Sequence, residues 1–114
     1  MMFGLCSSLK SLDLSSFNTK KVINMPYMFM ACQSLENLNL TSFTGEKIQN
    51  MTMMFGECKS LQYPNLSNFY ANEGANIFNM FWDCNSLKKE NLITNDKKIL
   101  DELLGQIKYN KYYG

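Results

Sequence analysis

The feature that most constrains the fold is an internal period of 26 residues, which no insertion interrupts along four successive copies. The cysteines show it most simply, because Cys6, Cys32, Cys58 and Cys84 follow one another at this interval. A segment of this length cannot bury its own apolar face, whereas stacked copies share one continuous core. The period therefore predicts a stack of sequence repeats in which each recurring apolar residue forms one row of the core.

Other apolar positions recur in the same register and define the pattern M-F-x-x-C-x-S-L-x-x-L-x-L-x-x-F. The recurring columns are Met2, Met28, Met54 and Met80; Phe3, Phe29, Phe55 and Phe81; Leu9, Leu35, Leu61 and Leu87; Leu14, Leu40, Leu66 and Leu92; and Phe17, Phe43 and Phe69. We expect these columns to form the core. The cysteines between them are expected to be buried, reduced thiols rather than disulfides or metal ligands, because their side chains run parallel along the stack.

Each repeat is expected to contain one short strand and one helical turn. The L-x-L triplet alternates between inward and outward side chains, so residues 12–14 and 38–40 are predicted to pair as parallel strands. We therefore expect Leu40→Ala to destabilise the chain strongly and Asn39→Ala to change its stability little. The M-x-x-M-F-x-x-C segments, Met25–Cys32 and Met51–Cys58, space apolar residues three and four apart, which predicts a helical turn.

The repeats lose their regularity toward the C-terminal end. Pro64 and Glu90 stand where the earlier copies have Leu12 and Leu38. Because Pro64 has no backbone N–H, the third strand is predicted to be shortened or bulged at its start. Glu90 would be an unpaired buried charge if it pointed inward, so we expect the regular stack to stop near Leu92.

The sequence after Leu92 changes to the pattern of an amphipathic helix that caps the stack. Thr94 or Asn95 is expected to be its N-cap, and Asp96 favours the positive end of the helix. The predicted apolar face comprises Ile99, Leu100, Leu103, Leu104 and Ile107. Trp82, at a position held by Gly4, Met30 and Gly56 in the earlier copies, is expected to pack under this helix. The expected domain organisation is residues 1–94 as four repeats, the first incomplete, and residues 95–114 as a capping helix and tail.

The string from Met28 to Phe43, with Cys32, Leu35 and the L-x-L that ends at Leu40, resembles the bacterial-surface-protein (BspA-like) leucine-rich repeat, a family also described as a domain of unknown function. The resemblance covers about residues 1–95. It implies an α/β repeat fold, a right-handed leucine-rich-repeat-like solenoid with short parallel strands, here closed by the C-terminal capping helix. It also implies a cell-surface or secreted protein that acts in adhesion and protein binding.

The composition narrows the function classes. The chain has no His and no Arg, and its eleven Lys and ten carboxylates leave a net charge of +1. Without His there is no imidazole base or ligand, and neither a nucleophile motif nor a phosphate loop is present, so we expect no enzyme, no cofactor and no metal. The balanced charge predicts no nucleic-acid partner, and the short apolar runs predict no membrane insertion. The N-terminal residues lack a secretory signal pattern, so a cytoplasmic location stays an alternative.

Function is expected on the outward positions of the strands, because the core does not dictate these residues. The candidate partner-binding residues are Ser11, Asp13, Ser15, Asn37, Asn39, Thr41, Tyr63, Asn65 and Ser67, with Lys89, Asn91 and Ile93 at the same positions of the fourth copy. Small amides and hydroxyls with one Tyr suit a protein or glycan ligand. The alternatives are a structural spacer in a larger surface protein and an intracellular interaction scaffold.

The N-terminal edge of the stack is expected to be bare. The chain begins inside a repeat, so Met2, Phe3 and Leu5 and the strand at residues 12–14 have no preceding copy to cover them. Uncovered edges of this kind seek partners. We therefore expect a fragment of a longer stack that associates weakly with itself through this edge.

Overall fold

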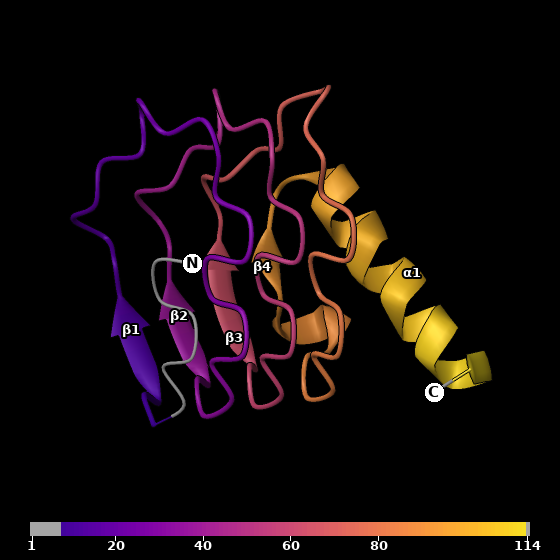
Figure 1. Cartoon of the computed structure of the whole chain (residues 1–114). Coiled ribbons are helices and arrows are strands. Elements are labelled where there is room, and N and C mark those ends of the chain that lie inside the picture. Colours follow the sequence, from indigo (N-terminus) through magenta and orange to yellow (C-terminus); the bar gives the residue numbers. More distant parts are fainter. Residues whose placement is uncertain (1–7, 114) are drawn as a thin grey trace.

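The computed structural model describes residues 8–113 and shows one parallel sheet with a long helix at its end (Figure 1). The elements are β1 (Ser11–Asp13), β2 (Asn37–Asn39), β3 (Tyr63–Leu66), the 3-10 helix η1 (Lys89–Asn91), β4 (Ile93–Thr94) and α1 (Lys97–Tyr113). The strands lie in the order β1-β2-β3-β4, and α1 packs beside β4 and η1. The sheet is thus built in chain order, with the helix beyond its last strand.

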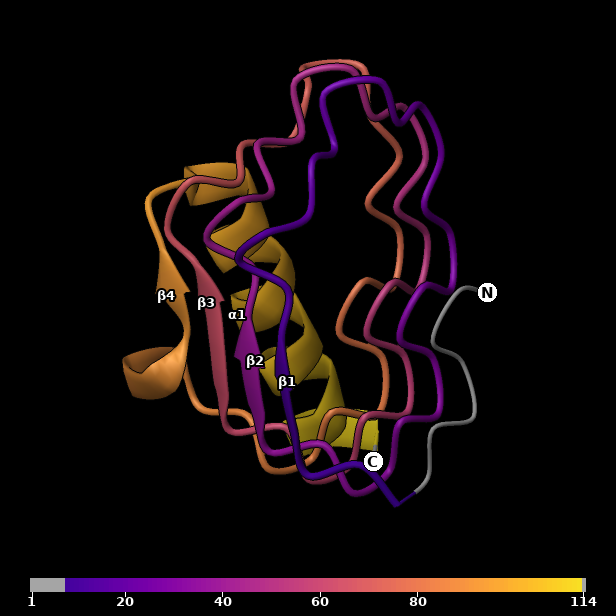
Figure 2. The ribbon, with the colours of Figure 1, turned by 90° about the vertical axis from the view of Figure 1, so that its left-hand side faces the viewer.

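The register of the sheet follows the sequence period over the first three strands. Leu12 pairs with Leu38, and Leu38 pairs with Pro64, so partners in the sheet are residues that lie one period apart. Figure 2 shows the consequence, because successive turns of the chain lie one behind another. Each column of the repeat therefore becomes a row that runs across the strands.

The core consists of such rows. Phe29, Phe55 and Phe81 stack with ring centroids 5.6 Å apart at both steps and with nearly parallel planes. A second row contains Phe43 and Phe69, which are fully buried, and Phe17, which stacks on Phe43 at 6.4 Å but is 38% exposed. The Leu column Leu35, Leu61 and Leu87 is buried as well. Because each ring covers the next, the aromatic residues contribute both apolar area and stacking to the contact between repeats.

The segments expected to form helical turns are not helical. Met25–Cys32 consists of successive turns, and Tyr27 and Ala31 have left-handed φ angles of 58° and 64°. Its backbone pairs with the following copy instead, with Met25 N–H donating to Asn50 O at 2.8 Å and Phe29 N–H donating to Met54 O at 2.9 Å. A helix would use these N–H groups within the segment, whereas the turns direct them to the neighbouring repeat. Apolar spacing of three and four residues is compatible with either backbone, so the periodicity alone misled the prediction.

The third strand is neither shortened nor bulged at Pro64, which corrects a second expectation. β3 has four residues and Pro64 lies in regular register with Leu38. In a parallel ladder successive residues direct their N–H groups to alternate neighbours. Leu14 N–H donates to Asn39 O and Leu40 N–H to Asn65 O, so this class of position donates toward the next repeat. By the same alternation the nitrogen of Pro64 is directed toward the fourth copy, where the pairing of β3 with β4 begins only at Asn65, so the missing N–H costs no ladder hydrogen bond.

The fourth copy departs from the period by two residues. Asn65 pairs with Ile93 rather than with Asn91, because η1 occupies the place where the strand would begin. A slip of two residues keeps each side chain on its original face of the sheet. Glu90 lies in η1 and is exposed, so the predicted buried charge does not arise. The pairing also continues through Thr94, slightly beyond the predicted end at Leu92.

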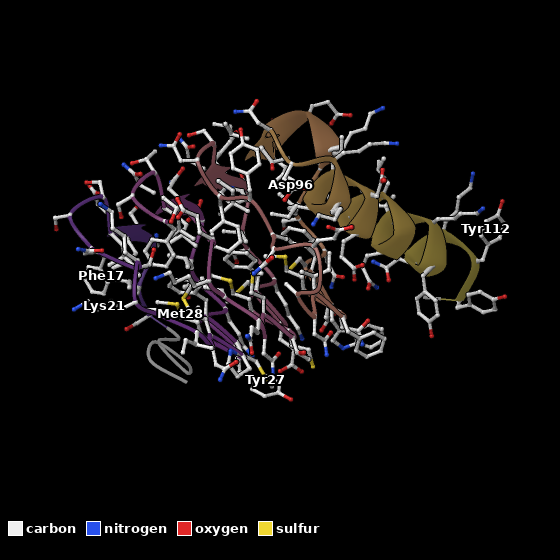
Figure 3. All side chains as sticks on the ribbon, turned by 90° about the horizontal axis from the view of Figure 1, so that it is seen from above. Phe17, Lys21, Tyr27, Met28, Asp96 and Tyr112 are labelled. Carbon is white, nitrogen blue, oxygen red and sulfur yellow. The ribbon has the colours of Figure 1, made fainter. Side chains whose placement is uncertain are left out.

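Helix α1 begins with a different cap from the one predicted, and the predicted apolar face is buried only in part, at Ile99 and Leu103, with Leu100 partly buried against the core. Asp96, not Thr94 or Asn95, is the N-cap, and its Oδ1 accepts the N–H of Lys98 at 2.8 Å. The buried residues are Ile99, Leu103 and Gln106, while Leu104 and Ile107 are 38% and 39% exposed. Asp96 Oδ2 also accepts the N–H of Ala71 at 2.6 Å, and Lys98 Nζ donates to Ala71 O at 2.6 Å, so these bonds join the start of the helix to the third copy. Figure 3 shows Asp96 at the start of α1 and Tyr112 near its other end.

The described cysteines are buried free thiols. Cys58 donates its S–H to Phe29 O at 3.0 Å, and Cys84 donates to Phe55 O at 2.9 Å. Burial raises the pKa of Cys58 to about 12 and raises that of Cys84 as well. Cys6, Met2, Phe3 and Leu5 lie outside the described residues. Since only thiolates are good nucleophiles, Cys58 and Cys84 are expected to be unreactive near neutral pH.

We expect native Cys32, Cys58 and Cys84 to resist an aromatic disulfide reagent near neutral pH and to react once the chain is unfolded. The physical reason is that the core must open before a buried thiol can meet the reagent as a thiolate. Labelling followed by peptide mass analysis assigns the reaction to each cysteine. Rapid native labelling of Cys58 or Cys84 would contradict the buried arrangement, and so would fewer than four reactive thiols in denaturant without reductant.

Candidate functional site

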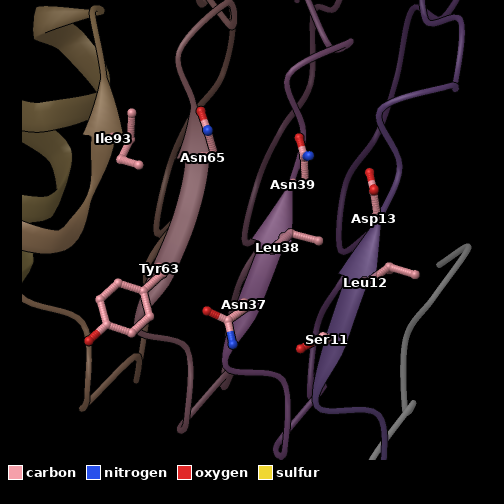
Figure 4. Close-up of a pocket in the computed structure, with 9 residues that line it drawn as sticks. All are labelled: Ser11, Leu12, Asp13, Asn37, Leu38, Asn39, Tyr63, Asn65 and Ile93. Carbon is pink, nitrogen blue, oxygen red and sulfur yellow. The ribbon is translucent and has the colours of Figure 1, made fainter.

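The outer face of the sheet carries a shallow groove of about 440 Å³ (Figure 4). Its lining combines most of the candidate partner-binding residues with apolar residues, namely Ser11, Leu12, Asp13, Asn37, Leu38, Asn39, Tyr63, Asn65 and Ile93. Ser15, Thr41 and Ser67 do not line it. Figure 4 shows two rows of polar side chains that cross the strands, one at the start of each strand and one near its end.

The row near the strand ends consists of Asp13, Asn39 and Asn65 and has a structural role. The Oδ1 atoms accept the backbone N–H of Ser15, Thr41 and Ser67 at 2.9, 3.0 and 3.1 Å. Each contact is an Asx turn, which ends the strand. Hydrogen bonds from the side chain and the backbone of Ser15 lower the pKa of Asp13. The Oδ1 acceptors of this row are therefore already engaged by the protein's own backbone.

The positions after the strands also serve the fold. Thr41 O accepts Asn68 Nδ2 at 2.7 Å, and Ser67 O accepts Asn95 Nδ2 at 3.0 Å, so side chains of one copy bind the backbone of the copy before it. Thr41 and Ser67 thus contribute both an N–H and a C=O to structural contacts. The motif that signals these turns was visible in the sequence, since Asp or Asn is followed two residues later by Ser or Thr in each of the first three copies.

The row at the strand starts, Ser11, Asn37 and Tyr63, differs from the other two. All three residues are exposed, and within residues 8–113 their side chains form no hydrogen bond or ion pair. They are cross-strand neighbours, which parallel pairing places about 4.8 Å apart. Their hydroxyl, amide and phenol groups are consequently available to a ligand. These three residues form the start row of the groove.

The fourth copy contributes one apolar residue, Ile93, to the lining of the groove, whereas its polar residues Lys89 and Asn91 do not line it. Ile93 is 48% exposed beside Asn65, in the place that the period would give to Asn91. Lys89 and Asn91 leave the strand face with η1. The groove therefore has Tyr63 and Ile93 at one end and the carboxylate of Asp13 at the other, without any lysine in its lining.

Within residues 8–113 no three His, Cys, Asp or Glu side chains lie where they could hold a metal ion together. No helix in this part has the length and apolar character needed to cross a bilayer.

Comparison with known proteins places the chain in a family. Residues 1–102 match the family described as Mycoplasma protein of unknown function, DUF285. The chain belongs to this family. The DUF285 match includes the first turn of α1, so the helix start is part of the family unit rather than an addition to it. Neither a curated protein nor a solved structure matches the chain.

The DUF285 match corrects the expected relationship. The resemblance to BspA-like leucine-rich repeats was wrong, and the cell-surface location and adhesive role that it implied lose their basis. Stacked strands require rows of apolar side chains in the core between them, and the L-x-x-L-x-L string with its Met and Phe columns supplies those rows. Because any stack of repeats requires apolar rows, the motif indicates a stacked core and does not identify the family.

Proposed function

We propose that this DUF285 chain is a binding module without catalytic activity, and that it binds a segment of a partner protein through the groove on the outer face of its sheet. We also propose that its sequence repeats form a right-handed solenoid, which holds this face rigid. The start row carries the proposal, because the side chains of Ser11, Asn37 and Tyr63 are exposed and form no hydrogen bond within residues 8–113. Binding surfaces are built from such residues, which the core does not dictate.

The character of the groove indicates the partner segment. Tyr63 and Ile93 offer an apolar end, Asn37 and the Nδ2 groups of Asn39 and Asn65 offer directional hydrogen bonds, and Asp13 offers a negative charge. Tyr is a frequent source of binding energy because it buries a large area at a small loss of side-chain entropy. A polypeptide segment with an apolar side chain at one end and a basic side chain at the other is complementary to this arrangement.

Tyr63→Ala is expected to weaken peptide binding at least about tenfold while leaving the free energy of unfolding within about 0.5 kcal/mol. Peptides selected from a random display library on the wild-type chain serve as probes, and titration calorimetry gives the dissociation constants. Tyr70→Ala is the matched control, because Tyr70 is 50% exposed, Tyr63 is 48% exposed, and Tyr70 lies outside the groove.

Asn37→Ala tests the same groove through a hydrogen bond and is expected to weaken the same peptides. Selected peptides that bind the Tyr63 and Asn37 variants as tightly as the wild type would overturn the proposal. A selection that yields no peptide would also overturn it and would favour the alternative of a structural spacer in a larger protein. Within residues 8–113, β1 pairs with β2 on one side only. Weak self-association through its other edge stays a separate prediction.

A further inference from the structure

A cluster of three aromatic rings lies at the far end of α1, away from the groove. The rings of Trp82 and Tyr109 are 5.9 Å apart between centroids and tilted by 52°, and those of Tyr109 and Tyr113 are 5.1 Å apart and tilted by 35°. Tyr109 and Tyr113 stand four residues apart on one side of α1, while Trp82 comes from the turn that follows the Phe row. A hollow of about 370 Å³ adjoins the cluster.

Core packing does not account for this cluster. Tyr109 is 46% exposed and Tyr113 is 78% exposed, so most of the Tyr113 ring meets solvent. The sequence period does not require Trp82 either, because Met30 and Gly56 occupy the same position in earlier copies. Aromatic side chains gathered at one exposed place indicate a contact surface, whereas scattered ones do not.

The hollow also has polar walls, formed by Asp83, Asn85 and Asn110. Gln106 Nε2 donates to Asn110 Oδ1 at 3.0 Å, which orients the Asn110 amide and leaves its Nδ2 as a donor. Asp83 Oδ2 lies 3.8 Å from Lys59 Nζ, so the carboxylate already has a cation beside it. The charge of the hollow is therefore largely balanced, and its remaining groups are amides, carboxylate lone pairs and aromatic faces.

A second hollow, which also borders Trp82 and Tyr109, contains the carboxyl group of Glu102. Unlike Asp83, Glu102 is bound by backbone groups. Burial raises the pKa of Glu102, while backbone hydrogen bonds from Asn79 and Met80 act in the opposite direction. Those bonds join α1 to the fourth copy. Because Glu102 already binds the backbone of the fourth copy, it is less available to a ligand than Asp83. The hollow beside Asp83 is therefore the better ligand site.

We propose that the hollow beside Trp82, Tyr109 and Tyr113 binds one pyranose ring of a neutral glycan. The apolar C–H face of the sugar would lie against the aromatic faces, whose negative quadrupole attracts polarised C–H groups. The Asp83 carboxylate and the Asn85 and Asn110 amides would then bind the hydroxyl groups at the ring edge. A volume of about 370 Å³ lies at the small end of ligand pockets, which suits one sugar unit.

The Lys59 ammonium group beside the Asp83 carboxylate favours a neutral sugar over an organic cation as the ligand. Aromatic rings beside a carboxylate also suit a quaternary ammonium group, but such a ligand would have to compete with Lys59 for Asp83. A neutral polyol accepts and donates hydrogen bonds without displacing the lysine. The site shares no residue with the groove, so the two proposals stand independently.

The test uses the emission of Trp82, the only tryptophan of the chain, which borders this hollow and the one that contains Glu102. Variants of Tyr113 and Asn85 assign a response to this hollow, because these two residues line it and do not line the other. The probes are methyl pyranosides of glucose, galactose, mannose and N-acetylglucosamine, together with their neutral oligosaccharides and, as the cationic comparison, choline. A saturable change in Trp82 emission with at least one neutral saccharide is expected. Tyr113→Ala and Asn85→Ala should each weaken it at least about tenfold, because each removes one wall of the hollow.

Three controls make the result specific. Tyr112→Ala changes a 65% exposed tyrosine on the same helix that does not line the hollow, and it should leave the saccharide affinity unchanged. Tyr63→Ala should leave it unchanged as well, since Tyr63 belongs to the groove. Lys59→Ala should preserve saccharide binding and allow choline to bind. Absence of a response to every saccharide would overturn the proposal, as would a response to choline alone in the wild-type chain, or equal effects of the Tyr112 and Tyr113 variants.

Discussion

Leu40→Ala is expected to lower the free energy of unfolding by about 2 to 5 kcal/mol, the range of large-to-small changes in a close-packed core. Leu40 is fully buried, and it follows β2 at the centre of the sheet, where its backbone N–H donates to Asn65 O at 3.1 Å. Truncation would leave a cavity between two repeats that cannot close without breaking the register of the rows on both sides. Urea unfolding followed by circular dichroism measures the loss.

Asn39→Ala is the matched comparison in the neighbouring position, and the structure revises the effect expected from the sequence. The side chain was predicted to be dispensable, but its Oδ1 accepts the N–H of Thr41 at 3.0 Å and forms the turn that ends β2. We now expect a loss of about 1 kcal/mol, the usual contribution of one hydrogen bond. Equal losses for Leu40→Ala and Asn39→Ala would contradict the inward and outward assignment of the strand.

Asp96→Ala is expected to lower the free energy of unfolding by about 2 to 4 kcal/mol, the combined effect of a lost helix cap and a lost charge-assisted hydrogen bond. The Asp96 carboxylate is only 7% exposed. It accepts the N–H of Lys98 at the start of α1 and the N–H of Ala71 in the third copy. Its removal leaves the buried N–H of Ala71 without a partner and detaches the start of the helix.

Hydrogen exchange distinguishes detachment of α1 from general destabilisation. In the Asp96→Ala chain the amides of α1 should exchange faster than those of β1 to β3, because the lost contacts cap the helix and join it to Ala71 of the third copy. Asp101→Ala provides the control, since Asp101 is an exposed carboxylate on the same helix. Unchanged protection of α1 in the Asp96 variant, or equal effects of the two substitutions, would show that Asp96 does not anchor the helix.

The sequence placed the candidate residues on the outward positions of the strands, but it did not show which of them the protein's own backbone already binds. Six of the nine candidate residues line the groove. Periodicity separates inward from outward side chains, but it does not distinguish an outward residue that binds the protein's own backbone from one that binds nothing. The structure makes that distinction, because it shows the turns at Asp13, Asn39 and Asn65 and leaves Ser11, Asn37 and Tyr63 without such contacts. The pocket beside Trp82 was invisible to the pattern, since Tyr109 and Tyr113 lie outside the repeated columns.

The sequence by itself determined which residues share an environment. Residues one period apart carry the same side chain because they face the same neighbours, so the buried rows of Phe29, Phe55 and Phe81 and the register of Leu12 with Leu38 could be read from spacing alone. Tertiary structure decided what depends on the direction of backbone groups. Pro64 is tolerated because the pairing of β3 with β4 begins only at Asn65. The Met25–Cys32 turns direct their N–H groups to the next copy, and Asp96 joins the start of α1 to Ala71. Apolar periodicity records which side chains leave water, whereas hydrogen bonds between distant segments depend on where the folded chain brings each donor and acceptor.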